Sequence, residues 1–388
     1  MAVVLNHTPH YAHGGFRENP WFFPALLMDL GYLGVPLFVL ISGFCIHRRA
    51  AIARMTTGTA SLNWIQFWKK RFWRLYPPYM AAIALSVTCA FVLHDRSPEV
   101  FRSLGPDLLT HLFLVHNLTA NYATGLANGA FWSLGMEEQL YLLYIPLILL
   151  LRRHAVFAAA IAIATTVFWR LLITSPLMTT LDSPGGLGLF GMWPFYYWMH
   201  WALGALAVDA YFGNTRLPAW CYSIRFAMIA ITAGCLTNSP IFSFLMKTGF
   251  AANPLLAAWS PHQQSISVLG ELMTALGFFL LMNWFVQNPQ QPVLHYRLSR
   301  GLACLGRISY SIYLTHVPVL FILEERFPLS HSVTDWLIRI VTFPTACVLA
   351  GALFFNVVER WFLAGRCPWF RSVANPLSEL APSGRSSS

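Results

Sequence analysis

The segment FWSLGMEEQLYLLYIPLILLL, residues 131–151, decides how the rest of the chain is interpreted. It is long and apolar enough to form a membrane-spanning helix, yet it carries two adjacent carboxylates, Glu137 and Glu138, near its start. Carboxylates in or near hydrocarbon are costly and tend to be paired, water-facing or functional. Neighbouring helix positions point about 100° apart, so Glu137 shares its face with Ser133 and Tyr141 and not with its neighbour. We expect one acid to face the interior of a helix bundle and the other the membrane surface.

The composition of the whole chain indicates an integral-membrane protein. Of its 388 residues, 56% are hydrophobic and only 10% are charged, whereas about 25% of the residues of a soluble domain are charged. A formal net charge of +10 is also found in nucleic-acid-binding proteins. Here the basic residues stand at the ends of apolar runs and not on one polar face, so we predict no nucleic-acid partner. The seven cysteines show neither a CxxC pair nor a metal-ligand spacing.

Apolar runs predict an all-α, polytopic transmembrane helix bundle. The first complete run, residues 26–46, is about 31 Å long as a helix and can cross the hydrocarbon. Residues 1–6 resemble the last turns of a span whose beginning is absent, so we predict about nine full spans plus a truncated first span. We assign residues 1–362 to one integral-membrane domain and the polar tail 363–388 to a disordered C-terminal segment. The further predicted spans are about 77–93, 133–151, 155–173, 192–212, 224–245, 266–286, 304–325 and 334–358.

The distribution of basic residues predicts the orientation of these spans. Alternate connecting segments hold 18 of the 25 Lys and Arg residues, and the opposite loops hold five. Such an alternation supports the span map and places the richer side, with the C-terminal tail, in the cytoplasm. His7 and Glu137 then lie toward the outer side. The basic segments are 47–76, 152–154, 213–225, 287–307 and 359–388.

The densest basic cluster is WKKRFWRLYPPY, residues 68–79. One interpretation is a positive-inside anchor with interfacial aromatic residues. The other uses Arg71 and Arg74, one helical turn apart, as a clamp for the phosphates of an anionic cofactor in the cytoplasm. The YPPY sequence at 76–79 predicts that an interfacial helix ends there and that the next span begins.

Three histidines near the N-terminus, His7, His10 and His13, invite a metal-site interpretation. A proline and two glycines interrupt this segment, which argues against one helical face that would gather the three rings, and we predict no metal site. His7 alone, at the end of an apolar stretch, is a candidate general base. The plainer alternative is an interfacial histidine at the end of a span.

Other polar residues fall inside predicted spans. His316 lies in the apolar run 308–323, where an imidazole needs a hydrogen-bonding partner. A structural role and a pore-lining role both remain open for it. Asp29 and Glu271 are expected to face inward and to be paired, with no assigned role.

Five sequence blocks, taken together, resemble the integral-membrane acyltransferase family 3. The resemblance implies a ten-span bundle that moves an acyl group, most often acetyl, from cytoplasmic acyl-CoA to a sugar hydroxyl of a surface or secreted glycan. It also implies a multi-pass location in the bacterial cytoplasmic (inner) membrane. The implied partners are acyl-CoA, membrane lipids and a glycan or lipid-linked sugar, with no permanently bound cofactor. The blocks are GVPLFVLISGF (34–44), RFWRLYPPY (71–79), FWSLGMEEQLYLLYIPL (131–147), LGRISYSIYLTHVPV (305–319) and VVERWF (357–362).

The resemblance assigns two catalytic residues. His7 matches the histidine that ends the family's first span and acts as its catalytic base, and Glu137 matches the acid of the WSL-x-x-E block. In the implied mechanism, neutral His7 removes a proton from an acceptor hydroxyl, which then attacks the thioester carbonyl. Glu137 orients His7 or stabilises its imidazolium.

The resemblance also assigns the donor site. Arg71 and Arg74 match the cytoplasmic arginine pair that meets the CoA phosphates, while the pantetheine arm reaches through the bundle toward His7. His316 matches the histidine of the SYxxYLxH block. Together with Trp132 and Ser133 it is a candidate pore-lining residue.

One departure from the family opens an alternative. The family's first span begins with an arginine-bearing segment, whereas only six residues precede His7 in this chain. Six residues, about 9 Å of helix, cannot cross a bilayer, so either the start is placed too late or the protein is an inactive truncated acyltransferase. A rival from another class is a transporter or flippase of a lipid-linked glycan, in which Glu137 and His316 relay protons. We find no internal repeat in the sequence of the kind that marks many transporters, which argues against this rival.

Overall fold

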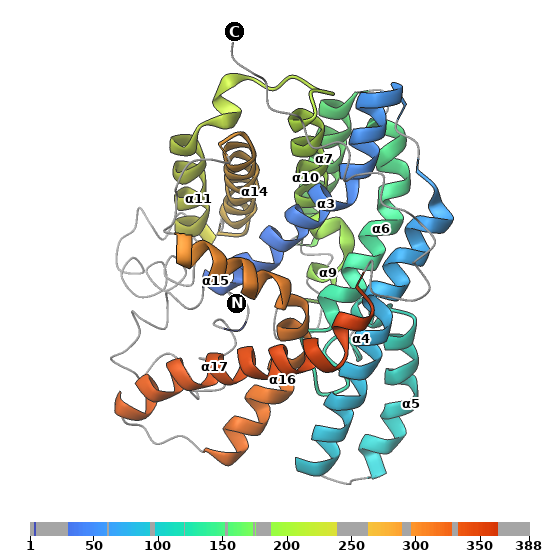
Figure 1. Ribbon diagram of the computed structural model, residues 1–388, viewed down its shortest axis with the longest axis vertical. Helices are drawn as coiled ribbons and strands as arrows, with labels where there is room; N and C mark the ends of the chain where they lie inside the picture. The colour runs from blue at the N-terminus through green and yellow to red at the C-terminus, as the bar shows by residue number, and fades with distance from the viewer. Residues whose placement is uncertain are drawn as a thin grey trace.

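Helices form all the regular secondary structure of the described residues in the computed structural model (Figure 1). The predicted all-α class is therefore confirmed. The described residues are Val4, 30–59, 62–93, 98–119, 121–151, 154–173, Ser175, 188–238, 263–288, 296–327 and 333–363.

The described part of each of the nine predicted spans falls mainly on a helix. Six helical stretches of the described residues are long and apolar enough to cross a membrane, which agrees with a multi-pass membrane protein. The full count of nine spans plus a truncated first span stays a prediction. The nine helices are α3 (Gly34–Thr57), α4 (Trp64–Leu93), α6 (Trp132–Leu151), α7 (Ala155–Ile173), α10 (Pro194–Tyr211), α11 (Ile224–Asn238), α14 (Gln263–Gln287), α16 (Ser309–Arg326) and α17 (Val333–Val357).

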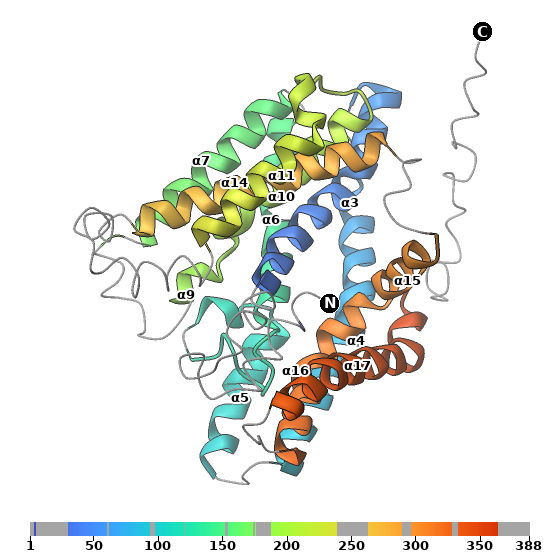
Figure 2. The same cartoon turned by 90° about the vertical axis from the view of Figure 1, so that its left-hand side faces the viewer.

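Shorter helices connect these elements. The α5 helix (Pro98–Leu112) returns alongside the far half of α4 (Figure 2). The α15 helix (Tyr296–Arg307) leads into α16, and α9 (Gly188–Gly191) precedes α10. Short 3-10 turns lie at η2 (Leu30–Leu33), η3 (His116–Leu118), η4 (Ala219–Tyr222) and η6 (Glu359–Trp361).

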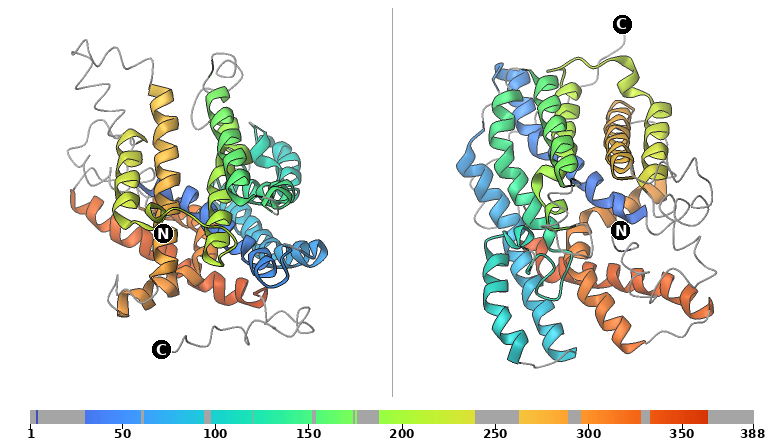
Figure 3. Two further views of the ribbon diagram at one scale, coloured as in Figure 1. Left: turned by 90° about the horizontal axis from the view of Figure 1, so that it is seen from above. Right: turned by 180° about the vertical axis from the view of Figure 1, so that it is seen from behind.

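The helices fall into two groups along the long axis of the molecule (Figures 1 and 2). In one group α10 is central and packs against α3, α7 and α14, while α11 packs on α14. In the other group α16 packs against both α17 and α4. The view from behind in Figure 3 (right) shows that α4 extends from the first group into the second.

The first group is held by a close crossing of α3 and α10. A Cβ atom added to Gly43 would lie 2.0 Å from the Trp201 carbonyl oxygen, and one added to Gly204 would lie 2.0 Å from the Leu40 carbonyl oxygen. Small residues at a crossing let two helix backbones touch, as in many membrane bundles. The crossing brings the next turns of α3 and α10 together as well, and there they place His47 opposite Asp209.

The prediction that the interfacial helix ends at the YPPY sequence is wrong, because α4 runs unbroken through Pro77 and Pro78. Each proline removes one helical hydrogen bond. The neighbouring tyrosines compensate by tertiary contacts: the Tyr76 hydroxyl donates to the Leu112 carbonyl, and the Tyr79 hydroxyl donates to the His111 carbonyl at 3.4 Å. Packing against the end of α5 thus overrides the local preference.

The predicted span 304–325 is also wrong at its start. The α15 helix ends at Arg307 and α16 begins at Ser309, with a change of direction between them (Figure 1). Three arginines stand among the twelve residues of α15, and such a helix does not continue into hydrocarbon. Beyond the bend, the Tyr310 hydroxyl donates to the Leu75 carbonyl at 3.0 Å, which ties α16 to α4.

Candidate functional site

Glu137 lies on the buried face of α6 and is held by two hydroxyl groups. Its side chain is 5% exposed. Ser42 of α3 donates to Oε1 at 3.0 Å, and Tyr141, one turn along α6, donates to the same oxygen. Ser133, one turn earlier, is buried on the same side. The face predicted from the spacing of Ser133, Glu137 and Tyr141 is therefore confirmed.

Glu138 points away from that face. It lines a groove of about 490 Å³ between α4 and α6, beside Trp68, Phe72 and Leu142. Phe72 and Leu142 are largely exposed, as expected for side chains that contact lipid. The two neighbouring acids of α6 therefore face the interior and the outer surface of the bundle, as predicted.

Arg71 and Arg74 line a second cavity, of about 320 Å³, between α3, α4 and the chain after η6. Two further cations line it, Arg49 of α3 and Lys70 of α4, and none of the described residues around it is acidic. We call this the cationic cavity. Four clustered positive charges without a carboxylate favour the binding of an anion with several charges, such as a phosphorylated ligand.

The cationic cavity lies next to Glu137. The Arg71 guanidinium carbon is 5.8 Å from the centre of the Tyr141 ring, whose hydroxyl donates to Glu137. Both Arg71 and Arg74 are close enough to act electrostatically on that carboxylate. The sequence predicted the acid and the arginines on opposite sides of the bundle. The structure brings them together because the part of α4 that carries the arginines packs on α6, where the ring centres of Phe67 and Tyr141 are 5.9 Å apart.

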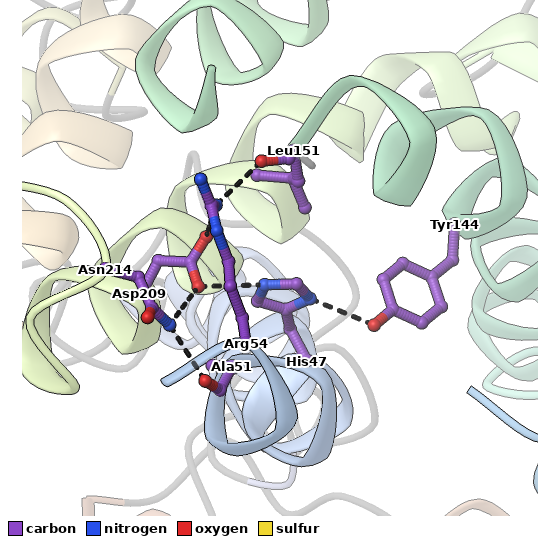
Figure 4. Close-up of polar contacts among 7 residues, drawn as sticks. All are labelled: His47, Ala51, Arg54, Tyr144, Leu151, Asp209 and Asn214. Carbon is purple, nitrogen blue, oxygen red and sulfur yellow. Dashed lines mark hydrogen bonds and ion pairs between the residues drawn. The ribbon is translucent and has the colours of Figure 1, made fainter. Parts of the chain in front are cut away.

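A second buried polar cluster was not predicted (Figure 4). His47 of α3 bridges two helices: Nδ1 lies 2.9 Å from the Tyr144 hydroxyl of α6, and Nε2 lies 3.3 Å from Asp209 Oδ1 of α10. His47 and Asp209 are 1% and 0% exposed. Nδ1 is therefore hydrogen-bonded, while Nε2 has a carboxylate oxygen within ion-pair distance in the interior, where an unpaired polar group is costly.

Two more side chains complete this cluster around Asp209. Arg54 Nη1 lies 3.4 Å from Asp209 Oδ2 and donates to the Leu151 carbonyl at 2.7 Å. Asn214 Nδ2 donates to Asp209 Oδ1 at 3.1 Å and to the Ala51 carbonyl at 2.8 Å. We call His47, Arg54, Tyr144, Asp209 and Asn214 the His47–Asp209 network. The one sequence signal for it was Asp209, a lone carboxylate in an otherwise apolar helix.

The three candidate pore-lining residues lie where α6 meets α10 and α16. Ser133 Oγ is 2.5 Å from the Tyr313 hydroxyl, and His316 Nδ1 is 2.7 Å from the Tyr313 carbonyl. The Trp132 ring lies 6.0 Å from that of Tyr197 on α10. His316 is fully buried, and neither the cationic cavity nor the groove beside Glu138 includes any of the three. A pore-lining role stays a prediction for them.

Several predicted residues lie outside the described part of the chain, namely His7, His10, His13 and Asp29. Among the described residues, no three His, Cys, Asp or Glu side chains are arranged to hold a metal, and the absence of a metal site stays a prediction. The expected pairing of Glu271 is confirmed, since Arg170 Nη2 lies 3.4 Å from its Oε2.

Val4 is buried against apolar residues of α16 and α17. Val4 therefore contacts the second group of helices. Ser311 of α16 donates to Glu359 Oε2 at 2.5 Å, which joins the SYSIYLTH and VVERWF sequence blocks. Both contacts reinforce the same part of the bundle.

A pair of stacked histidines lies between α5 and α6 in the chain: His111 is in the last turn of α5, and His116 begins η3. The rings of His111 and His116 are 3.8 Å apart and both are fully buried. Asp107 Oδ1 lies 3.0 Å from His111 Nδ1. Burial, and to a lesser extent the neighbouring His111, lowers the pKa of His116 to about 3. His116 is therefore neutral at physiological pH.

Comparison with known proteins identifies relatives over most of the chain. Residues 1–355 match the family model described as an acyltransferase domain. The peptidoglycan O-acetyltransferase OatA of Listeria monocytogenes is 24% identical over 303 residues, which cover 75% of this chain and 45% of that protein. A putative acetyltransferase, ORF330, of Acidianus two-tailed virus is 26% identical over 296 residues, which cover 76% of this chain and 74% of that protein.

A shorter match is to the O-acetyltransferase OatA of Staphylococcus aureus, 30% identical over 132 residues, which cover 32% of this chain and 21% of that protein. The chain thus spans less than half the length of the two OatA proteins. No solved structure matches it.

Proposed function

We propose that this chain, which belongs to the acyltransferase family whose model spans residues 1–355, transfers an acetyl group to a sugar hydroxyl of a surface glycan. Peptidoglycan is the first acceptor to test, because one relative is named a peptidoglycan O-acetyltransferase. The proposal includes the ten-span architecture and a location in the cytoplasmic membrane of a bacterium.

The observation that supports the proposal most strongly is the cationic cavity beside Glu137. An acyl-CoA donor carries several phosphate charges at one end and a thioester at the other. Arg71 and Arg74, with Arg49 and Lys70, offer cations for the phosphate end. The hydroxyl-bound carboxylate of Glu137 adjoins that cavity through Tyr141, so a donor held there can bring its thioester near the acid.

The proposed chemistry is acyl transfer by direct attack. The acceptor hydroxyl gives its proton to His7, its oxygen forms a bond to the thioester carbonyl carbon, and the carbon–sulfur bond breaks. The proton then passes to the departing thiolate, so that the products are the O-acetyl ester and free CoA. Glu137 stabilises the positive charge that His7 carries between these two events. Ser42 and Tyr141 hold the carboxylate in place meanwhile.

The donor is expected to enter from the cytoplasmic side. Arg48, Arg49 and Arg54 stand in the last turns of α3, and two further arginines, residues 152–153, follow α6. Basic residues at span ends mark the cytoplasmic side.

The experiment that tests the proposal uses membranes from cells that express the full chain. The membranes receive acetyl-CoA with a radiolabelled acetyl group and purified peptidoglycan. We expect label in the glycan that mild alkali releases as acetate, with stoichiometric release of CoA. Glycan labelled at the level of empty membranes would overturn the proposal. Movement of a lipid-linked glycan without consumption of acetyl-CoA would support the transporter alternative instead.

A further inference from the structure

The His47–Asp209 network lies on the side of α3 opposite to the cationic cavity. Cys45 and Arg49, four residues apart, line the cavity from α3. His47 and Arg54 contact Asp209 from the same helix. Residues two positions apart on an α-helix point about 200° apart around its axis. His47 is two positions from both Cys45 and Arg49, so it faces away from them. One face of α3 therefore serves the cavity and the other serves the network.

The network fixes the rotation of α3 about its own axis. Asp209 is fully buried and is contacted by an imidazole, a guanidinium and an amide. Rotation of α3 would separate His47 and Arg54 from this carboxylate and leave a buried charge without partners, which is strongly unfavourable. Asn214 adds a further restraint, since its amide holds the Ala51 carbonyl of α3 as well as Asp209.

The network also reaches the α4 wall of the cavity. Tyr144, which contacts His47 through its hydroxyl, packs with its ring centre 5.9 Å from that of Phe67. Phe67 lines the cationic cavity, and the Arg71 guanidinium carbon is 5.9 Å from its ring centre. The same imidazole thus supports one cavity wall on α3 and another on α4.

We propose that the His47–Asp209 network is a positioning element for the acyl donor. It fixes the orientation of Arg49 toward the cationic cavity and the position of the Phe67 ring that contacts Arg71. None of its residues lines the cavity, so it acts through these neighbours and takes no part in the bond-forming step. The inference rests on the proposed function, because it concerns the same donor site.

The first test separates donor binding from turnover. His47→Leu removes both contacts of the imidazole, and we expect the KM for acetyl-CoA to rise about tenfold, the effect of losing roughly one hydrogen bond to a charged group. The kcat and the KM for the glycan acceptor should stay within about twofold. His47→Gln can donate to Asp209 and accept from Tyr144 with its amide, so it should keep a KM close to that of the wild type.

A matched control distinguishes positioning from general loosening. Thr166 of α7 is fully buried and also joins α10, because its hydroxyl donates to the Phe195 carbonyl at 2.9 Å and accepts from Met199 N at 3.1 Å. Thr166→Val should leave the KM for acetyl-CoA unchanged. An equal rise in KM for Thr166→Val and His47→Leu would overturn the inference.

A second readout does not need catalysis. Cys45 lines the cationic cavity and is exposed, so its modification by a maleimide can be followed by peptide mass mapping while CoA is titrated. We expect CoA to protect Cys45 in the wild type, and half-protection in His47→Leu to need about tenfold more CoA. Should His47→Leu fail to fold, Tyr144→Phe keeps the ring on Phe67 and removes only the hydroxyl, with a smaller shift in the same direction.

These outcomes separate the two proposals. No protection of wild-type Cys45 by CoA, together with no transfer, would refute the proposed donor site itself. Protection of the wild type with an unchanged CoA requirement in both His47→Leu and Tyr144→Phe would refute the positioning role alone.

Discussion

Two buried carboxylates lie beside α3, and they differ in the groups that surround them. In our proposal Glu137 belongs to the reaction site and Asp209 to the framework that supports it. Asp209 is surrounded by an imidazole, a guanidinium and an amide, so its carboxylate is already paired within the protein. Glu137 is held by the hydroxyls of Ser42 and Tyr141, which donate hydrogen bonds but carry no compensating charge. Arg71 and Arg74 also act electrostatically on this carboxylate. In the proposed mechanism Glu137 stabilises a cation that forms during the reaction, such as an imidazolium.

The largest effect that we expect from this difference concerns turnover. Glu137→Gln keeps the size and hydrogen-bonding capacity of the side chain but removes the charge, and we expect acetyl transfer to fall by about 10²–10³-fold. Initial rates of label transfer in membranes, normalised to protein level, would measure this loss.

The matched control for that change is Glu138→Gln, because Glu138 is the next residue and faces the groove outside the bundle. It should change the rate by less than about threefold. A similar loss of transfer rate in both variants would mean that the inward position of Glu137 has no special importance for the reaction.

The next effect concerns donor affinity. Arg71→Ala removes a cation of the cationic cavity, and we expect the apparent KM for acetyl-CoA to rise about 10–30-fold because a charge-assisted contact to phosphate is lost. Arg48→Ala removes a neighbouring exposed charge that does not line the cavity. It should leave the KM unchanged, and a steady-state titration of acetyl-CoA with both variants makes the comparison. An unaltered KM in Arg71→Ala would count against the clamp.

A smaller effect concerns stability, and it should appear at Asp209 rather than at Glu137. Asp209→Asn leaves His47 and Arg54 without their carboxylate, and we expect a loss of about 2–3 kcal/mol in the free energy of unfolding. The figure is below that of a fully buried pair because Arg54 is 19% exposed. Thermal unfolding in detergent should show a lower Tm for Asp209→Asn than for Glu137→Gln. A lower Tm for Glu137→Gln than for Asp209→Asn would contradict the assignment of a structural role to Asp209.

The smallest effect involves His116, a buried imidazole stacked on another imidazole instead of being paired as His47 is. Its folded-state pKa of about 3 lies below the ordinary value of 6.5. Below pH 6.5 the unfolded chain therefore binds a proton that the folded chain does not, and stability falls as the pH is lowered from 6.5 toward 3. Between pH 7 and 5.5 we expect His116 to contribute a loss of about 1 kcal/mol. His116→Gln should reduce that slope, and an identical slope in both proteins would contradict the assignment.

The sequence predicted those features that depend on spacing within one helix. The inward face of Ser133, Glu137 and Tyr141 followed from helical periodicity, and the described part of each of the nine apolar runs is mainly helical. The pairing of Glu271 followed from the cost of an unpaired acid in a span. These features are local, so no knowledge of neighbouring helices was needed.

Features that depend on contacts between distant segments were missed. The continuation of α4 through Pro77 and Pro78 relies on tyrosine contacts with the end of α5. Arg49 joins Arg71 and Arg74 only because α3 and α4 lie side by side around one cavity. The sequence likewise contained no signal that His47, at the end of one predicted span, meets Asp209, near the end of another.

One measurement tests the central claim most directly: the initial rate of acetyl transfer to peptidoglycan at saturating acetyl-CoA, for wild type, Glu137→Gln and Asp209→Asn, each normalised to folded protein. We expect Asp209→Asn to keep a rate within about threefold of the wild type, because saturating donor offsets a positioning defect, and Glu137→Gln to lose at least about 10²-fold. Equal losses in the two variants, or a greater loss at Asp209, would contradict the assignment of Glu137 to the reaction and of Asp209 to its frame.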